Sequence, residues 1–320
     1  MRITVIGCGR WGSFIAWYLD HIGHQVTLYG REGSANLRRF RETRCNDYLR
    51  LPESVALSSA LDCVLAAETV VISVGSQALA KVANSLAALG FDGTKIPLVL
   101  CMKGIEVSTG RRLSQVVTDG LGPKTRVAVW LGPGHVQEFI KGAPNCMVID
   151  SEDEALKAEL VAAFSSDLIR FYYGADLIGN EIGAAAKNVV GIAAGMLDGL
   201  GLATLKGALM SRGTMEISRL IGAMGGNPMS AYGLCHLGDY EATVFSPHSH
   251  NRCFGELFVK GEPYDKLAEG YYTVRALVKM AGEHGVELPI CEHLYRILFE
   301  GGDVQQSLDA LFTRSLKSEY

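Results

Sequence analysis

The sequence lacks an excess of charge of either sign, and it lacks long hydrophobic runs. Among 320 residues, 30 are lysine or arginine and 34 are aspartate or glutamate, which gives a formal net charge of −4. Proteins that bind nucleic acid without sequence preference usually carry a basic surplus, so this balance argues against that class. The apolar run at residues 189–197 is too short to span a bilayer, and no membrane span is expected.

Two further absences concern the cysteines and the N-terminus. None of the eight cysteines forms a C-x-x-C pair, and several fall inside apolar, strand-like runs, so we predict reduced core thiols and no disulfide framework. The chain opens on the strand-like "RITVI" and has no basic segment that leads into an apolar stretch, so we expect no signal peptide. A cytoplasmic location is the resulting expectation.

The first half of the chain alternates short apolar runs with amphipathic, helix-like segments. This alternation predicts an α/β fold with a doubly wound, Rossmann-type parallel sheet that helices cover on both faces. Strands are predicted at residues 2–6, 25–29, 69–74, 97–101, 126–131, 146–150 and 169–173.

Strand signals end near Asp176, and alanine, leucine, glycine and methionine then recur at helical spacing. Residues 207–226 and 269–285 read as amphipathic helices that end at glycine. We therefore predict two domains, a dinucleotide-binding domain at residues 1–178 and an all-helical substrate domain at residues 179–320.

A glycine-rich turn, Gly7-Cys8-Gly9-Arg10-Trp11-Gly12, follows the first predicted strand and opens a helix. The pattern G-x-G-x-x-G in that setting predicts a dinucleotide site, because its glycines allow a tight turn and close approach of a pyrophosphate. After the second predicted strand stands Arg31, which suits the 2′-phosphate of NADP, and Glu32, which can serve a ribose hydroxyl. NADP is therefore the predicted cofactor, with NAD as the alternative.

Lys187 lies inside "GAAAKNVVG", a helical stretch that is otherwise small or apolar. Desolvation lowers the pKa of such a lysine toward neutrality, where it can exchange a proton with a substrate that a nicotinamide reduces or oxidises. The alternative is a lysine whose stem covers apolar surface while its amine reaches water. Lys103 and Gly132-Pro133-Gly134 each follow a predicted strand, where a doubly wound sheet binds its ligand.

These segments resemble the bacterial NAD(P)-dependent glycerol-3-phosphate dehydrogenases. The similar stretches are "GCGRWGSFIAWYL", "MKGIE", "LGPGHVQE", "GAAAKNVVGIAAGMLDGLG", "LGDYEATVFSPHSHNRCFG", "AEGYYT" and "GVELPI". The resemblance implies reduction of dihydroxyacetone phosphate to sn-glycerol 3-phosphate for phospholipid synthesis, and a homodimer. Lys187 would be the proton donor, Asp239 the acid that helps to hold this lysine and the substrate, and Lys103 a contact to cofactor and substrate.

The resemblance and the glycine turn together give the remaining predicted site residues. The additional substrate contacts are Gly132, Gly134, Thr243, Ser249, His250 and Asn251. The cofactor contacts are Gly7, Gly9, Arg10, Trp11, Gly12, Arg31, Val136, His250, Leu267 and Glu269.

The chain departs from the family at His250, where arginine is usual, and at Gly134 and His135. Histidine cannot bind phosphate as a permanent cation, so Arg252 is a candidate substitute, and Lys103 or a helix N-terminus could also share the phosphate. A different small keto substrate, as in ketopantoate reductases, and a non-catalytic NAD(P) sensor are the alternatives. Cys235, His236, His248, His250 and Cys253 lack the usual zinc-binding spacings, and no metal is predicted. The remaining histidines, His135 among them, suggest no site.

Overall fold

The computed structural model describes residues 1–315, and the first half of this range contains one eight-stranded sheet. All seven predicted strands are present. The strand order is β3-β2-β1-β4-β5-β6-β7-β8. The strands are β1 (Arg2–Ile6), β2 (Gln25–Tyr29), β3 (Ala56–Ser58), β4 (Thr69–Ile72), β5 (Leu98–Leu100), β6 (Val127–Leu131), β7 (Asn145–Asp150) and β8 (Ile169–Tyr173).

The sheet differs from the prediction in two places. Strand β3 was not predicted, because its three residues at the sheet edge carry too short a pattern. Strand β7 pairs with β6 in the antiparallel direction, whereas every other pair is parallel, so one pair departs from the predicted parallel arrangement. The short connection through α5 returns the chain beside β6 without the crossover that a parallel pair needs.

Both faces of the sheet are covered, as the apolar strands predict. Successive residues of β4 enter different cores: Val71 packs with α1 and α6, whereas Val70 and Ile72 pack with α3 and α4. The helices of this half are α1 (Arg10–His21), α2 (Ala35–Thr43), α3 (Leu79–Ala88), α4 (Leu113–Leu121), α5 (Val136–Ile140) and α6 (Glu154–Phe164).

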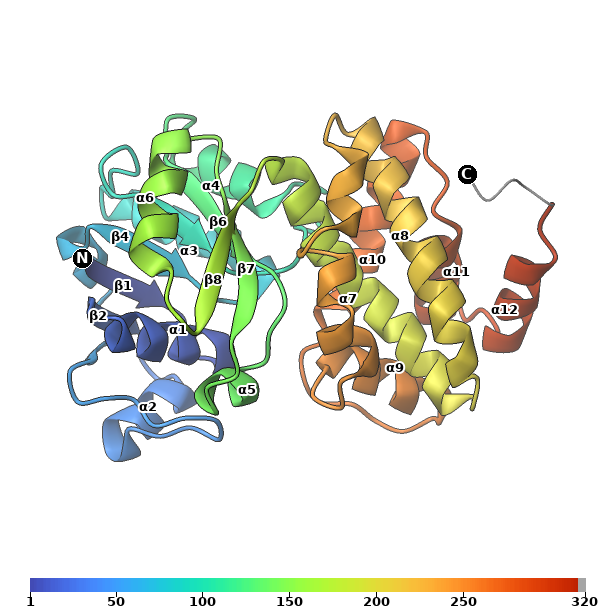
Figure 1. Cartoon of the computed structure of the whole chain (residues 1–320), viewed down its shortest axis with the longest axis horizontal. Coiled ribbons are helices and arrows are strands. Elements are labelled where there is room, and N and C mark those ends of the chain that lie inside the picture. The colour runs from blue at the N-terminus through green and yellow to red at the C-terminus, as the bar shows by residue number, and fades with distance from the viewer. Residues whose placement is uncertain (316–320) are drawn as a thin grey trace.

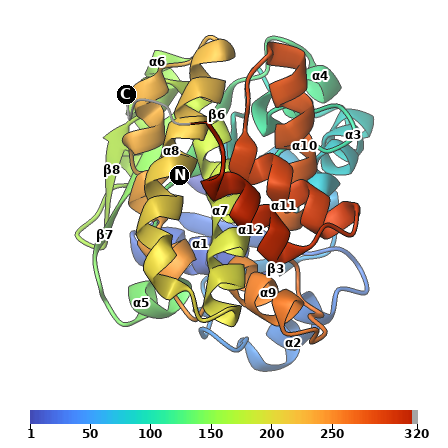
Figure 2. The ribbon, with the colours of Figure 1, turned by 90° about the vertical axis from the view of Figure 1, so that its right-hand side faces the viewer.

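The second half is helical, and α7 forms its centre. Figure 1 shows α7 leaving the sheet domain and crossing the helical domain, with α8, α9 and α10 packed around it. Viewed from the helical end, α12 lies outermost (Figure 2). The helices are α7 (Leu177–Gly199), α8 (Lys206–Ala223), α9 (His250–Val259), α10 (Glu269–His284), α11 (Pro289–Phe299) and α12 (Val304–Phe312). The predicted boundary after residue 178 falls in the first turn of α7 and stays a prediction.

Glycines let α7 and α9 approach closely. A Cβ atom at Gly195 would lie 1.9 Å from the carbonyl oxygen of Arg252, and one at Gly255 would lie 2.0 Å from that of Ile192. Neither backbone can take a side chain there, so this pair of helices holds a fixed spacing.

A buried ion pair joins α7 to the sheet domain. The Glu181 carboxylate on α7 accepts hydrogen bonds from the backbone N–H (2.8 Å) and hydroxyl (2.6 Å) of Ser114, and it pairs with the Arg112 guanidinium at 2.5 Å. These groups are buried, and each charge is compensated by a partner from the other domain. Within residues 1–315 no helix has the length and hydropathy needed to cross a membrane.

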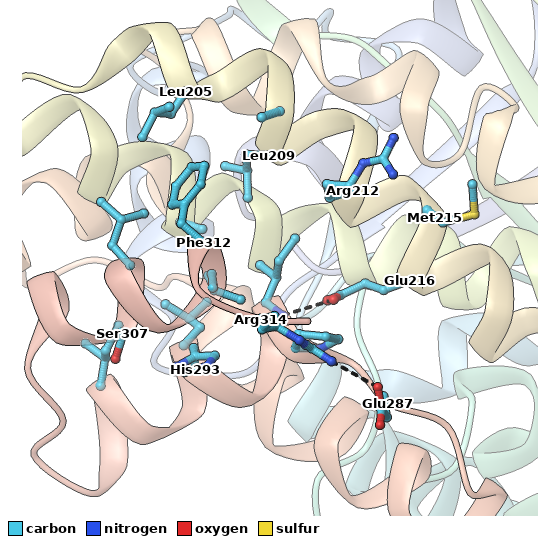
Figure 3. Close-up of a pocket in the computed structure, with 18 of the residues that line it drawn as sticks. Leu205, Leu209, Arg212, Met215, Glu216, Glu287, His293, Ser307, Phe312 and Arg314 are labelled. Carbon is cyan, nitrogen blue, oxygen red and sulfur yellow. Dashed lines mark hydrogen bonds and ion pairs between the residues drawn. The ribbon is translucent and has the colours of Figure 1, made fainter. Parts of the chain in front are cut away.

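The helical domain contains an apolar cavity of about 970 Å³ between α8, α11 and α12 (Figure 3). Glu216 of α8 lies at one end and accepts hydrogen bonds from the backbone N–H groups of Ile290 and Cys291, at 2.9 Å and 3.1 Å. Burial raises the pKa of Glu216 from its ordinary value of 4.5 to about 7. The carboxyl group is therefore protonated in the folded chain at a pH at which the unfolded chain has lost that proton.

This raised pKa predicts how the stability of the protein depends on pH. The stabilising contribution of protonated Glu216 is complete below about pH 4.5 and is lost as the pH rises through about 7, at no more than about 1.4 kcal/mol per pH unit. Glu216→Gln should therefore flatten the decline of unfolding free energy between pH 5 and pH 8, measured by urea denaturation. The exposed residue Glu262 supplies the control, Glu262→Gln. An unchanged slope in Glu216→Gln would contradict the prediction.

Candidate active site

A cleft of about 930 Å³ lies between the two domains, at the carboxyl ends of β1, β2, β4 and β5. Chain order reverses between β1 and β4, which is where doubly wound sheets bind their ligands. Every predicted site residue except Gly132 lines this cleft. Residues at distant positions in the sequence, from Gly7 to Glu269, are thus brought to one cleft.

The glycine turn between β1 and α1 has the form that a dinucleotide needs. Gly7 has φ +114°, and a Cβ there would lie 2.0 Å from the Ser73 carbonyl oxygen; a Cβ at Gly12 would lie 1.9 Å from the carbonyl oxygen of Gly7. A Cβ at Gly9 would meet no atom within 4 Å. Gly7 and Gly12 therefore serve close packing, whereas Gly9 leaves open space at the N-terminus of α1, where a pyrophosphate fits.

The cleft continues from this turn along the end of β2. Arg31 is exposed and lines this part, together with Ser34 and Arg39, which were not predicted. The Arg39 guanidinium pairs with Asp47 at 2.7 Å. Arg31 is exposed at the cleft, so its guanidinium has room to turn toward a ligand phosphate.

Asp239 holds two lysines at the opposite end of the cleft. Its Oδ2 lies 2.6 Å from Nζ of Lys103 and 3.0 Å from Nζ of Lys187. Lys103 also donates to the Gly132 carbonyl oxygen, and Lys187 donates to Oγ1 of Thr243 at 2.7 Å. The Thr243 hydroxyl in turn donates to the Asp239 carbonyl oxygen at 2.8 Å. We call Lys103, Lys187, Asp239 and Thr243 the lysine cluster.

Lys187 is buried within this cluster, and its environment changes its pKa. Burial lowers the pKa from 10.5 to about 8, although the negative charge of Asp239 acts in the opposite direction. An amine with a pKa of about 8 exchanges its proton readily near neutral pH. The alternative of a lysine whose amine reaches water is wrong, because only 8% of Lys187 is exposed.

A chain of amide hydrogen bonds joins the lysine cluster to the helical domain. Nδ2 of Asn188 donates to the Lys103 carbonyl oxygen at 2.8 Å, and Nδ2 of Asn251 donates to Oδ1 of Asn188 at 2.9 Å. The backbone N–H of Gly270 donates to Oδ1 of Asn251 at 2.9 Å. Asn188 was missing from the predicted site, although it follows Lys187 directly in the sequence.

Glu269, at the start of α10, forms a second contact between the domains. Its carboxylate accepts from the Ser76 hydroxyl at 2.6 Å and from the Ser76 backbone N–H at 3.1 Å. Leu267, just before it, is 53% exposed at the cleft. Ser76 gave no signal in the sequence, because a serine in a loop after a strand is common.

The loop after β6 adds a buried histidine. Gly132 (φ +125°) and Gly134 (φ +143°) have backbone conformations that favour glycine. His135 between Gly134 and Val136 lines the cleft, so the expectation that it belongs to no site was wrong. Burial and the charges of Arg10 and Lys187 lower its pKa to about 4, so its ring is neutral at pH 7. Its Nε2 and Oδ1 of Asp239 are buried without hydrogen-bond partners among the described residues, which fits a site that completes its contacts with a ligand.

The segment around α9 corrects one expectation about phosphate binding. Ser249 caps α9, and Nδ1 of His250 lies 2.6 Å from the Tyr264 hydroxyl. Burial lowers the pKa of His250 below 6.5. Arg252 pairs with Asp198 at 2.8 Å and does not line the cleft, so it does not replace the arginine that the family usually has.

The cysteine and histidine residues near α9 do not converge. His236 is buried and bonded to the Gly183 carbonyl oxygen and the Tyr240 hydroxyl, both at 2.8 Å, whereas His250 contacts Tyr264. Within residues 1–315 no group of three or more His, Cys, Asp or Glu side chains could hold a metal ion.

Family profiles match both halves of the chain. The profile described as NAD-dependent glycerol-3-phosphate dehydrogenase N-terminus matches residues 2–157, and the corresponding C-terminus profile matches residues 176–309. Glycerol-3-phosphate dehydrogenase [NAD(P)+] 2 of Salinibacter ruber is 37% identical, with 99% of this chain and 96% of the relative covered. The enzyme of Chlorobium luteolum named glycerol-3-phosphate dehydrogenase [NAD(P)+] is 36% identical, with 100% and 99% covered.

Solved structures agree with these matches. The crystal structure of glycerol-3-phosphate dehydrogenase from Coxiella burnetii superimposes with a TM-score of 0.90 at 29% identity, covering 98% of this chain and 99% of that one. A 2-dehydropantoate 2-reductase from Methylococcus capsulatus has a TM-score of 0.60 at 17% identity, covering 99% of each chain. The second likeness shows the fold alone. The predicted fold class, a Rossmann-type sheet followed by a helical domain, is confirmed.

The glycine turn predicts different outcomes for two similar substitutions. Gly9→Ala meets open space, so the melting temperature should stay near that of the wild type, while the Kd of NADPH should rise by about tenfold, or about 1.4 kcal/mol. Gly12→Ala forces a contact with the Gly7 backbone and should lower Tm by roughly 4–10 °C. Thermal unfolding and titration of NADPH fluorescence measure both effects. Unaltered NADPH binding in Gly9→Ala would show that no phosphate passes over Gly9.

Proposed function

The chain belongs to the NAD-dependent glycerol-3-phosphate dehydrogenase family, and on that premise we propose that it interconverts dihydroxyacetone phosphate and sn-glycerol 3-phosphate with NAD(P)H. One observation carries the proposal: Nζ of the buried Lys187 lies 3.0 Å from Asp239 in the cleft that the glycine turn also lines. A cofactor-binding turn and a proton-exchanging amine in one cleft are what carbonyl reduction requires.

Lys187 has one N–H left for a substrate. An ammonium group has three N–H donors. In Lys187, one N–H points to Thr243 and a second points to Asp239. The third can hydrogen-bond to a carbonyl oxygen and transfer its proton as that oxygen gains negative charge. When bound, the nicotinamide supplies the hydride to the carbonyl carbon. In the opposite direction the neutral amine of Lys187 accepts the proton of the hydroxyl group.

Asp239 and Lys103 set the charge around this reaction. Two ammonium groups share one carboxylate, which leaves one net positive charge in a largely buried cluster. That charge stabilises an oxygen that becomes negative in the transition state. The Lys103 ammonium likewise uses two of its three N–H donors, one for Asp239 and one for Gly132. Its third N–H can contact the same substrate.

The rest of the cleft is assigned to the ligands as follows. The substrate contacts are Ser249, His250, Asn251, Thr243 and Gly134, together with Gly132, which lies outside the cleft lining but accepts a hydrogen bond from Lys103. The cofactor contacts are the glycine turn, Arg31, Val136, His250, Leu267 and Glu269. Exposed at the end of β2, Arg31 supports NADP, since an arginine binds a 2′-phosphate well. We also propose a homodimer and a cytoplasmic location, with the product supplying phospholipid synthesis.

A substrate panel tests the activity. Dihydroxyacetone phosphate should be reduced with NADPH, followed by the loss of the absorbance of the reduced nicotinamide. Ketopantoate and unphosphorylated dihydroxyacetone should be reduced far more slowly. NADH should support the same reaction. Faster turnover of ketopantoate would move the chain to a different reductase activity, and absence of turnover with every ketone would favour the sensor.

Replacement of Lys187 tests the mechanism. Lys187→Met should lower kcat by about 10²–10⁴-fold, while NADPH binding stays near that of the wild type because Lys103 still pairs with Asp239. In the wild type, kcat/KM for reduction should fall as the pH rises through about 8, where the ammonium is lost, and kcat/KM for oxidation should rise there. Retained turnover in Lys187→Met, or parallel pH profiles in the two directions, would exclude this role of Lys187.

A further inference from the structure

His236 lies directly before the short 3₁₀ turn, Leu237–Asp239, that carries Asp239 to the lysine cluster. The Asp239 backbone N–H donates to the His236 carbonyl oxygen at 3.0 Å, so the two residues belong to one rigid turn. The His236 side chain is fully buried and does not line the active-site cleft. Its polar contacts are therefore with the protein itself.

The ring of His236 joins this turn to α7 and to Tyr240. Nδ1 lies 2.8 Å from the Gly183 carbonyl oxygen, and Nε2 lies 2.8 Å from the Tyr240 hydroxyl oxygen. A carbonyl oxygen can only accept, so Nδ1 carries the proton. Burial lowers the pKa of His236 to about 4, so the ring is neutral and Nε2 accepts the proton of the Tyr240 hydroxyl group. One tautomer satisfies both nitrogens.

Tyr240 holds the other end of the turn. Its ring is fully buried in an apolar cluster with Val190 and Ala194 of α7. Its hydroxyl oxygen accepts a hydrogen bond from the Thr214 hydroxyl on α8 at 3.3 Å. Asp239 thus lies between two buried side chains, of which the first is bonded to α7 and the second to α8.

The His236 contact on α7 lies one helical turn before Lys187. Gly183 and Lys187 are four residues apart, so they lie on the same side of the helix. A Cβ at Gly183 would lie 3.0 Å from the Cβ of His236, so the glycine lets the turn pack closely against α7. The turn that carries Asp239 is therefore bonded to the same side of α7 from which Lys187 reaches the Asp239 carboxylate.

We propose that His236 is a positioning residue that holds the Asp239 carboxylate within hydrogen-bonding distance of Lys187. This assignment rests on the proposed function and adds a residue to its machinery that lies outside the cleft. The negative charge of Asp239 opposes the effect of burial on the pKa of Lys187. A turn that holds Asp239 less closely would therefore lower that pKa further and leave less ammonium for proton transfer at neutral pH.

Three other groups around the cleft act on Lys187 through their charge state. Lys103 after β5 and Arg10 at the start of α1 are cations that lower its pKa. The ring of His135 after β6 is neutral at pH 7. Both nitrogens of His236 are bonded elsewhere, so a substitution at His236 leaves these three groups in place.

Two substitutions at His236 separate positioning from packing. His236→Leu keeps apolar bulk and removes both hydrogen bonds, so it should lower kcat/KM for dihydroxyacetone phosphate by about 10- to 100-fold, mainly through kcat. The pH at which kcat/KM for reduction falls should move down from about 8 by about one pH unit. His236→Asn can place its amide nitrogen where Nδ1 lies and donate to Gly183, so it should retain most of the activity and nearly the wild-type pH profile.

Ser218→Ala is the matched control for lost stability. Ser218 on α8 is buried outside the cleft, and its hydroxyl donates to the Pro228 carbonyl oxygen at 2.9 Å. This variant should lower Tm and leave the pH profile unchanged. Tyr240→Phe keeps the ring and removes the hydroxyl group, so it should move the profile in the same direction by a smaller amount, and it decides the question if His236→Leu does not fold. An unmoved profile in His236→Leu and Tyr240→Phe, or equal losses in His236→Asn and His236→Leu, would overturn the assignment.

A titration of the Lys187 side chain separates this assignment from the activity. If the wild type reduces no ketone, the proposed function fails, but the nitrogen NMR signal of the Lys187 amine, identified by its loss in Lys187→Met, still reports its pKa. The midpoint should lie near pH 8 in the wild type and in His236→Asn, and lower in His236→Leu. The same midpoint in all three proteins would refute a positioning role of His236.

Discussion

The carboxylate of Asp239 is the group on which the rest of the active site depends. One of its oxygens contacts two ammonium groups, one from the end of β5 and one from the middle of α7. Without this carboxylate, two positive charges would face each other in a largely buried place, which proteins do not tolerate unless the charges are neutralised. Asp239 therefore allows Lys187 to be buried while still carrying its proton, because the carboxylate opposes the burial that lowers the pKa of this lysine to about 8.

Small residues on α7, the helix that carries Lys187, let the neighbouring helices pack close to it. Small residues along α7 admit the backbone of α9 on one side, and Gly270 admits α10, since a Cβ there would lie 2.5 Å from the Asn188 carbonyl oxygen. A short π-helix, Glu241–Phe245, follows Asp239 and carries Thr243 toward Lys187. Such wide turns are frequent at functional sites because they redirect a side chain. Close packing and one irregular turn thus set the distances within the lysine cluster.

The sequence predicted the parts of this arrangement that rest on local patterns. The apolar runs of the sheet, the glycine turn and the buried Lys187 each have a signal within a few residues. No local sequence signal indicates the direction of β7, because a buried strand has the same composition in either direction. The neutral ring of His135 and the pairing of Arg252 with Asp198 depend on neighbours distant in the chain, so local patterns could not predict them. The resemblance supplied Asp239, but only the fold shows that a single oxygen of this residue contacts both lysines.

The ion pairs across the domain boundary bear on how such a protein can be divided. Glu181 of the helical half neutralises Arg112 of the sheet half, and Asp239 neutralises Lys103 in the same way. A fragment ending before α7 would keep its glycine turn but would retain Arg112 and Lys103 without their carboxylates. The two halves are therefore not interchangeable building blocks: recombination with a foreign partner preserves the active site only if both acidic residues come with it.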